Sequence, residues 1–583
     1  MSKKIIALLL VLCILLCTVA CGNPKKKQGN KKPPVSSDVS SSDTVSTESD
    51  LVDEEVEEGE EVTIPQNTTS KVTSTYTVSQ TGILNLNIDN SKVFNKNWNG
   101  INAIHQGFIF MPDEYGREYS DAQIEEELKR MGDMDINMVR SYMDAGYAFE
   151  KRSGKEVTYD WDNERMKGFY KWLDAMEERD IEVAVQMGWS IGSIGGATTQ
   201  DSGGYKIPWY ESGKLNIYSD MIKMYTDWVE LFIKEVIIKR GYDIEHLVMF
   251  TEPYHFNEYT FFVAPGKKET KNGWEVTVDV IQATHKALKK AGLRDKVKLT
   301  GPQYGMSSKF FEGETLEEEL KWWIDRIDEC IDVYTFHWYI PTWPGNGSSS
   351  SSANLMDDNY DLWIYYFEEM VRIIGKTGKP FWFDEWMYGG SAEKLAREIQ
   401  VQDFYPQQIA QTSIAAMNAG LNSALLWQLF EIVWPNSLQN NHEFIDGIHK
   451  LGTAPSLYES AIPYKYYYGF SLLAKYCGEK GSKVYSGEGE RGVYCSMVEY
   501  KKNGKQYQNV IVVNTSSLEQ KMSINFKKKI GKNMYRYLFD PIKIVPDTSA
   551  KMIPVDKGFK NVKTILQDTI PAASIVVYST VKD

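Results

Sequence analysis

The chain has 583 residues, too many for one ordinary compact domain, and its formal net charge of −14 argues against nucleic acid as a partner. The acidic charge is concentrated in ESDLVDEEVEEGEE at 48–61, which contains no basic residue. The aromatic content of 13% includes 16 Trp and 35 Tyr. Aromatic rings fill large cores and also stack on sugar rings, so the composition is compatible with carbohydrate binding without establishing it.

The first segment, MSKKIIALLLVLCILLCTVAC at 1–21, resembles a bacterial lipoprotein signal peptide. Lysines precede an apolar run that is too short for a normal membrane span, and Cys21 follows small residues. In such signals the cysteine is lipidated and becomes the first mature residue. The resemblance implies lipidation of Cys21 and anchoring to a bacterial cell membrane on its extracytoplasmic side. An ordinary signal peptide or a buried apolar segment is the alternative.

The next segment, 22–79, is predicted to be a disordered tether. Residues 22–75 contain no Phe, Trp or Tyr and are rich in Ser, Thr and acidic residues. Such a composition cannot bury enough apolar surface to offset the loss of chain entropy.

The cysteines do not form a metal or disulfide framework. Three of the six lie in the signal segment, and the others are Cys330, Cys477 and Cys495. A single bridge between Cys477 and Cys495 stays an open alternative.

From about residue 95, short apolar runs alternate with longer amphipathic segments. The runs span 100–108, 136–142, 181–189, 246–252, 297–302, 332–339, 380–386 and 423–430. The segments between them have helical periodicity, and one of them opens with Ser120 and Gln123 in capping-box spacing. Eight β-then-α units over ~370 residues are typical of a (β/α)8 barrel, so we predict an α/β protein with this barrel over 80–478.

The pattern changes after YKYYYGFSLLAKY at 464–476. GVYCSMVEY, YQNVIVVNTS, KMSINFKK and ASIVVYST read as strands joined by turn residues. We predict a small C-terminal β-sandwich over 479–583. The alternative is a set of strands added to the barrel.

Two glutamates end barrel runs and are the candidate catalytic pair. Glu252 ends the fourth run, HLVMFTE, and Glu385 lies near the end of the seventh, PFWFDEW. The reactive residues of (β/α)8 barrels lie at the C-terminal ends of the strands, and strands four and seven face each other. Two carboxylates there can flank one glycosidic bond, one as acid and one as nucleophile. A single strand-end glutamate is more often a turn or salt-bridge residue.

The barrel resembles clan A of the retaining glycoside hydrolases, which includes families 5, 30, 39 and 79. The resemblance rests on TEP on strand four, FHWY on strand six, DEW on strand seven and Trp427 on strand eight, and it covers roughly residues 95 to 475. The following β-sandwich is similar to that of families 30, 39 and 79. The resemblance implies that Glu252 is the acid/base, that Glu385 is the nucleophile, and that no metal or organic cofactor is needed.

The resemblance also implies substrate-binding and orienting residues. Arg140, at the end of strand two, would donate a hydrogen bond to Glu385 and keep it ionised. His337 or Tyr339, after strand six, would orient Glu385 or bind a sugar hydroxyl. Trp427 would form the platform under the sugar at the cleavage point. Trp189 and Trp386 are among the further candidates for stacking on sugar rings, although most buried tryptophans only pack.

Thr251 departs from the family pattern. Members of the clan usually have Asn before the acid/base, where it binds the sugar 2-hydroxyl. A threonine side chain is shorter and carries no amide donors, so recognition of the 2-hydroxyl would differ here.

The sequence therefore predicts a retaining glycoside hydrolase that cleaves β-glycosidic bonds of a plant or microbial glycan by double displacement. We expect a monomer that binds an oligo- or polysaccharide and contacts the membrane through its N-terminal lipid. The alternatives are a non-catalytic surface glycan-binding lipoprotein and a transglycosylase. The pair of glutamates favours an enzyme, because binding alone needs no paired carboxylates. The sugar, the linkage and the choice between endo and exo action stay open.

Overall fold

The structure is a computed structural model that describes residues 82–111, 119–153, 156–188, 218–249, 261–262, 270–271, 273–305, 315–340, 359–388, 405–429, 432–433, 445–446, 462–490 and 492–583. The chain divides into two compact units, Met1–Thr75 and Tyr76–Asp583. Every described residue lies in the second unit, so the predicted signal peptide and tether fall outside the described residues. Of the helices in the described ranges, none combines the length and apolar character needed to cross a bilayer.

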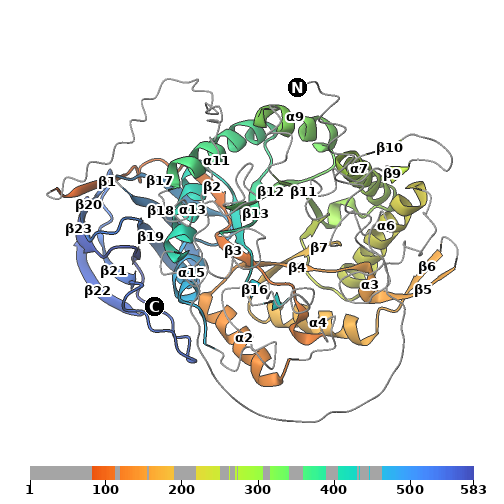
Figure 1. Cartoon of the computed structure of the whole chain (residues 1–583), viewed down its shortest axis with the longest axis horizontal. Helices are drawn as coiled ribbons and strands as arrows, with labels where there is room; N and C mark the ends of the chain where they lie inside the picture. The colour runs from red at the N-terminus through yellow and green to blue at the C-terminus, as the bar shows by residue number, and fades with distance from the viewer. Residues whose placement is uncertain are drawn as a thin grey trace, which may run out of the picture. The chain divides into compact units, whose positions relative to one another are not determined.

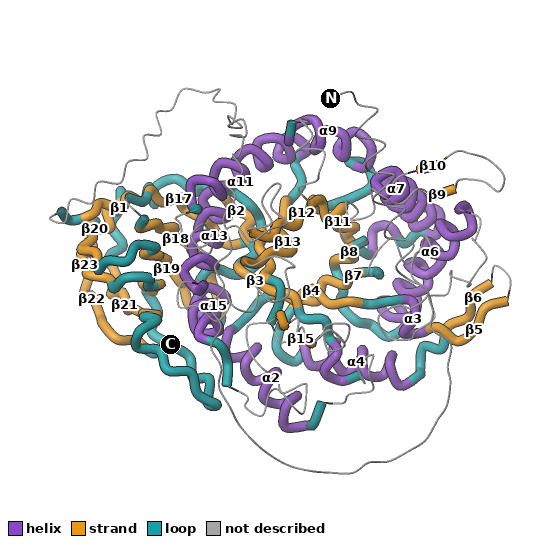
Figure 2. The backbone as a smooth tube through the Cα atoms, in the orientation of Figure 1, coloured by secondary structure: helices purple, strands orange, loops and turns teal. Residues whose placement is uncertain are grey.

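Eight parallel strands close into a barrel within this unit. In barrel order they are β3 (Ile101–Ile104), β4 (Met138–Tyr142), β7 (Glu182–Gln186), β8 (His246–Val248), β11 (Lys298–Gly305), β12 (Val333–Ile340), β13 (Phe381–Tyr388) and β14 (Ser423–Leu426). Figure 2 shows this ring of strands inside a ring of helices. Each of the eight predicted runs supplies one strand, and the predicted (β/α)8 barrel is confirmed.

Helices connect the strands and cover the outside of the barrel (Figure 1). The longer ones are α2 (Asp121–Met134), α4 (Glu164–Glu177), α6 (Tyr218–Phe232), α7 (Gly273–Ala291), α9 (Leu316–Ile327), α11 (Tyr360–Ile374), α13 (Tyr405–Ala419) and α15 (Lys465–Tyr476). Shorter elements are α3 (Ala145–Ala148), the 3-10 turns Phe108–Phe110, Arg294–Lys296 and Gly375–Thr377, and the π-helical turn Ile233–Lys239 after α6. The predicted capping box of Ser120 and Gln123 is present at the start of α2.

Among the described residues, three two-stranded antiparallel sheets lie in the connections between barrel elements. They pair β5 (Phe149–Ser153) with β6 (Glu156–Tyr159), β9 (Phe261–Phe262) with β10 (Thr270–Lys271), and β15 (Ile432–Val433) with β16 (Ile445–Asp446).

The C-terminal strands form a separate β-domain beside the barrel. They are β17 (Ser482–Glu488), β18 (Val493–Lys502), β19 (Lys505–Asn514), β20 (Gln520–Phe526), β21 (Lys532–Phe539), β22 (Val555–Val562), β23 (Ile565–Ile570) and β24 (Ile575–Ser579). Their order is β22-β21-β24-β19-β18-β17-β1-β20-β23, and β2 pairs with β17. The prediction of a separate β-domain at the C-terminus is therefore confirmed.

Two strands of this β-domain come from the N-terminal end of the described chain. β1 (Leu84–Ile88) pairs in parallel with β20, and β2 (Asn95–Trp98) pairs with β17. The predicted barrel range of 80–478 includes β1 and β2, but both strands belong to the β-domain, so the predicted boundary is wrong for these two strands. The sequence LNLNI alternates buried and exposed residues, as expected for a strand with one face toward a core and one toward solvent.

The β-domain packs tightly on the barrel helices. In β19, Val510 and Val512 lie in the interior of the β-domain, whereas Ile511 and Val513 belong to the core shared with the barrel. Both faces of this strand are buried, which explains its uninterrupted apolar run. The side-chain amide of Asn418 on α13 donates to a carbonyl oxygen of the β-domain at 2.9 Å.

The three cysteines within the described ranges are buried thiols. Burial raises the pKa of the Cys495 thiol to about 12. Cys477 and Cys495 are unlinked, so the alternative of a disulfide between them is not realised.

Deleting β1 and β2 should destabilise the protein strongly, whereas deleting only the residues before them should not. Leu84, Leu86 and Ile88 are almost fully buried, and burying each aliphatic side chain contributes about 1.5–3 kcal/mol. A chain starting at Gln80 should keep the parental melting temperature, and a chain starting at Asn99 should melt far lower or fail to fold. Thermal unfolding followed by circular dichroism compares the two truncations. Equal melting temperatures would show that β1 and β2 are dispensable.

Candidate active site

Arg140, His337 and Glu385 meet inside the barrel, at or beyond the middle of their strands. The Nη2 atom of the Arg140 guanidinium donates to Glu385 Oε2 and to the Tyr142 hydroxyl, the latter at 3.3 Å. The Nη1 atom donates to Asp384 Oδ2 at 3.1 Å and lies 3.1 Å from His337 Nε2. These side chains are nearly fully buried, with Glu385 only 4% exposed. The structure therefore places a cation against two carboxylates in the barrel interior.

Asp384 and Glu385 both face Arg140 because β13 contains a bulge. Regular alternation would send two consecutive side chains to opposite faces of the sheet. On the side of β12, Phe383 pairs with one residue and Glu385 pairs with the very next one, which leaves Asp384 without a counterpart. The register toward β14 also slips between Phe383 and Trp386. The extra residue redirects one carboxylate into the barrel, as bulges near active sites commonly do.

A second bulge lies on β11 and positions Gln303. The step from Gly301 to Tyr304 spans three residues on β11 but only two on β12. Gln303 has a φ of 55°, and its backbone N–H donates to Thr335 Oγ1 at 2.9 Å. Its side-chain Nε2 donates to Asp384 Oδ2 at 2.8 Å. The hydrogen bond from Gln303 to Asp384 thus links β11 to β13 across β12, and both of its residues lie in bulges.

The charge of Arg140 is maintained by its neighbours. Burial opposes the charged form, but Tyr142, Glu385 and Asp384 together raise the pKa of Arg140 above its ordinary value. The site therefore contains a permanent positive charge next to Glu385. The guanidinium also lies 5.7 Å from the centre of the Tyr142 ring.

The described aromatic candidates differ in their surroundings. Trp427 is 8% exposed, and its ring meets Tyr142 edge-on, with ring centres 6.3 Å apart. The peptide bond after Trp427 is cis. Trp386 is fully buried and stacks on Phe383 with ring centres 5.6 Å apart. Trp427 is thus linked to the Arg140 network through Tyr142, whereas Trp386 packs in the core.

Several predicted site residues lie outside the described part of the chain. They are Trp189, Thr251 and Glu252. Tyr339 belongs to β12, where its backbone pairs with Met387, and the structure describes the backbone of this residue only. The predicted pairing of Glu252 with Glu385 therefore stays a prediction.

Three residues of the network were not singled out from the sequence. Tyr142 follows Arg140 by two positions, so the period of a strand places both on one face, and this signal was available. Asp384 and Gln303 reach the site only because of the bulges, which the sequence pattern does not reveal.

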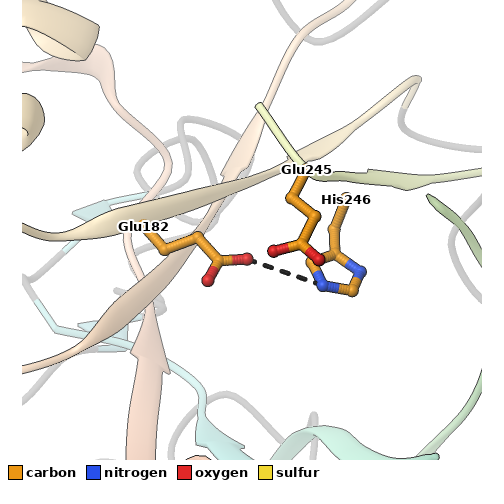
Figure 3. A group of neighbouring side chains, drawn as sticks. All are labelled: Glu182, Glu245 and His246. Atoms are coloured by element: carbon orange, nitrogen blue, oxygen red, sulfur yellow. Dashed lines mark ion pairs between the residues drawn. The ribbon is translucent and has the colours of Figure 1, made fainter. Parts of the chain in front are cut away.

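A group of possible metal ligands lies at the opposite end of the barrel strands (Figure 3). Glu182 begins β7, His246 begins β8, and His246 Nε2 is 3.5 Å from Glu182 Oε1. Burial lowers the pKa of His246 to about 3, so its ring is neutral. However, Lys480 Nζ lies 2.8 Å from Glu182 and 2.5 Å from Glu245, and Lys298 also pairs with Glu245. Because two ammonium groups already balance the two carboxylates, we assign no metal to this cluster.

Replacing Lys480 by Met should lower stability more at neutral pH than in acid. Partial burial opposes ionisation of Glu245, but hydrogen bonds from Lys298 and Lys480 lower its pKa to about 2. A lowered pKa means that the pair stabilises the fold above the ordinary value of 4.5, and that this contribution is lost as the pH falls toward 2. We expect a loss of about 1 kcal/mol at pH 7 and a smaller loss at pH 3, measured by chemical denaturation.

A matched control for this substitution is Lys529→Met, at an exposed position of the β-domain. It should change the free energy of unfolding little at either pH. An equal loss for Lys480→Met at both pH values would show that its effect is not electrostatic.

Comparison with solved structures shows a similarity of fold. No protein-family model matches the chain, and no curated protein matches its sequence. A GH30 endoxylanase from Clostridium papyrosolvens C71 is similar over 86% of this chain and 100% of its own, at 13% identity and a TM-score of 0.51. The catalytic domain of GH30 xylanase C from Talaromyces cellulolyticus matches 85% of this chain and 100% of its own, at 13% identity and a TM-score of 0.53. A monomeric β-xylosidase from Caulobacter crescentus CB15 matches 85% of this chain and 99% of its own, at 11% identity and a TM-score of 0.53. At these identities the likeness shows that the chain shares the fold of these glycoside hydrolases.

Proposed function

We propose that the protein is a retaining glycoside hydrolase in which Glu385 is the nucleophile and Glu252 the acid/base. The observation that carries the proposal is the contact of Glu385, beyond the middle of β13, with the fully buried Arg140 of β4. The C-terminal side of these strands is where barrels of this kind perform chemistry. The fold shared with two xylanases and a β-xylosidase supports the same assignment.

The proposed reaction has two steps. In the first, a carboxylate oxygen of Glu385 attacks the anomeric carbon while Glu252 donates a proton to the leaving oxygen, and a glycosyl ester forms as the glycosidic bond breaks. In the second, Glu252 removes a proton from water, whose oxygen attacks the same carbon and releases Glu385. Arg140 orients the nucleophile and supports its charge in both steps.

The sugar at the cleavage point is proposed to rest on Trp427. Its indole ring lies next to Tyr142, whose hydroxyl accepts from Arg140. A ring at this position can stack on the apolar face of a sugar while Glu385 attacks from the strand end. His337, Tyr339, Trp189 and Thr251 remain proposed substrate-binding or orienting residues, whereas the fully buried Trp386 is assigned to the core.

The proposed substrate is a β-linked plant or microbial glycan, with xylan-type chains as the first to test. A panel of aryl β-glycosides and polysaccharides, including xylan, should reveal hydrolysis by the parent protein and none by Glu385→Gln. If the parent binds a glycan but cleaves no member of the panel, and Glu385→Gln binds equally well, the protein is a glycan-binding protein instead.

We also propose that the mature chain begins at a lipidated Cys21 and works outside a bacterial cell membrane. The basis is the signal-like sequence at 1–21. Cys21→Ser should release the protein from the membrane fraction and abolish its labelling by radioactive fatty acid. Continued labelling of the variant would refute the anchor.

A further inference from the structure

Asp384 is a second buried carboxylate on the guanidinium that holds Glu385, and the two-step reaction above does not use it. It is 1% exposed. Its Oδ2 accepts from Arg140 Nη1 at 3.1 Å and from Gln303 Nε2 at 2.8 Å. Its Oδ1 lies 3.5 Å from His337 Nε2. Because this carboxylate reacts in neither step, it can affect the reaction only through its neighbours.

Among the described residues, two carboxylates contact the Arg140 guanidinium. Arg140 on β4 and His337 on β12 contact Glu385, and the titratable groups that share the Arg140 guanidinium with it are Tyr142 on β4 and Asp384 on its own strand. One guanidinium charge is therefore shared by two carboxylates. Keeping an ionised carboxylate out of water costs several kcal/mol unless strong donors compensate.

The fold provides those donors by two separate irregularities. The bulge in β13 turns Asp384 toward Arg140, and the bulge in β11 brings the Gln303 amide to the same oxygen atom. Gln303 is itself fully buried and held through its backbone by Thr335. Without either bulge, regular strand geometry would not place this carboxylate and its amide donor together.

We propose that Asp384, held by Gln303, is a positioning residue that shares Arg140 with Glu385 and so weakens the ion pair that would otherwise hold the charge of the nucleophile. Arg140 alone would favour the ionised form of Glu385, but it would also hold the attacking charge in a tight ion pair. A second carboxylate on Nη1 divides the field of the guanidinium between two partners. The kinetic consequence rests on the proposed function, whereas the electrostatic effect does not.

The first test is the pH dependence of Asp384→Asn, which keeps the shape of the side chain and removes its charge. Removing a neighbouring negative charge favours ionisation of Glu385, so the acid limb of kcat/KM should move to lower pH by about one unit or more. The rate of glycosyl-enzyme formation should fall about 10- to 100-fold, because Arg140 then holds the charge of Glu385 in a tighter ion pair. Asp384→Glu keeps the charge and should restore the parental acid limb even where its rate is lower.

The matched control is Glu319→Gln. Glu319 is a buried carboxylate on α9, outside the barrel, that accepts a hydrogen bond from Tyr304. Its replacement also removes a buried charge and lowers stability, but it should leave the acid limb in place. A purely structural role for Asp384 predicts the same result for both variants.

The second test needs no substrate. In protein labelled with ¹³C at the glutamate side-chain carboxyl, the Glu385 signal is the one lost in Glu385→Gln. The midpoint of its pH titration should be lower in Asp384→Asn than in the parent. If the parent cleaves no glycoside and the midpoint still shifts, the proposed function fails while the electrostatic role of Asp384 stands. An unchanged midpoint in Asp384→Asn overturns the inference.

Discussion

Replacing Glu385 by Gln should reduce turnover by about 10⁴-fold or more on every substrate that the parent cleaves. An amide cannot form the glycosyl ester, so the first chemical step has no nucleophile. The loss should fall on kcat for activated and natural substrates alike, because protonation of the leaving group cannot replace bond formation at the anomeric carbon. Initial rates on an aryl β-glycoside and on a polysaccharide measure both cases.

The fold should survive this substitution. Asp384 continues to balance the charge of Arg140, and glutamine has nearly the same shape as glutamate. We therefore expect a melting temperature close to that of the parent, which separates lost chemistry from lost structure. A folded Glu385→Gln variant with rates within tenfold of the parent would remove Glu385 from the catalytic role.

Replacing Glu252 by Ala should produce a loss that depends on the leaving group. A natural glycan needs protonation of its leaving oxygen, so its hydrolysis should fall by about 10³-fold. An aryl glycoside with a good leaving group needs little protonation, so its first step should survive while the second slows. Pre-steady-state kinetics should then show a burst of released phenol followed by a slow steady state. Equal losses on both kinds of substrate would argue against an acid/base role.

Added azide should distinguish the two glutamates through the stereochemistry of its product. In Glu252→Ala, azide should attack the glycosyl-enzyme in place of activated water and yield a glycosyl azide of retained configuration. In Glu385→Ala, azide should instead occupy the place of the missing nucleophile and yield the inverted product. Proton NMR of the anomeric signal reads the outcome. The opposite assignment of products would exchange the two roles.

The barrel could be predicted because its strands carry a strong local signal. Each buried strand appears as a short apolar run, and each run is separated from the next by a helical period, as in α2 after β3. The β-domain was also predictable from its alternating strands and turn residues. The boundary of the barrel was predicted less well, since β1 is a five-residue strand whose partner β20 lies more than 400 residues away in the chain. Such long-range pairing leaves no local trace.

The active-site network could also be predicted only in part. Arg140 and Glu385 lie near the ends of predicted strands, and the contact between them follows from the barrel geometry. Asp384 could not be assigned in this way, because strand alternation places it on the face opposite Glu385. Only the register slip between β12 and β13 reverses that expectation. Gln303 depends in the same way on the irregularity in β11.

Trapping the covalent intermediate tests the central claim most directly. A 2-deoxy-2-fluoro glycoside with a good leaving group, made from the sugar that the parent hydrolyses, should inactivate the enzyme because the fluorine slows the second step more than the first. Intact-mass measurement should show one added glycosyl group per chain, and peptide mapping should place it on Glu385. A matching experiment with Glu385→Gln should show no added mass. An adduct on another residue, or a product of inverted anomeric configuration from the parent enzyme, would contradict the assignment of Glu385 as the nucleophile of a retaining glycoside hydrolase.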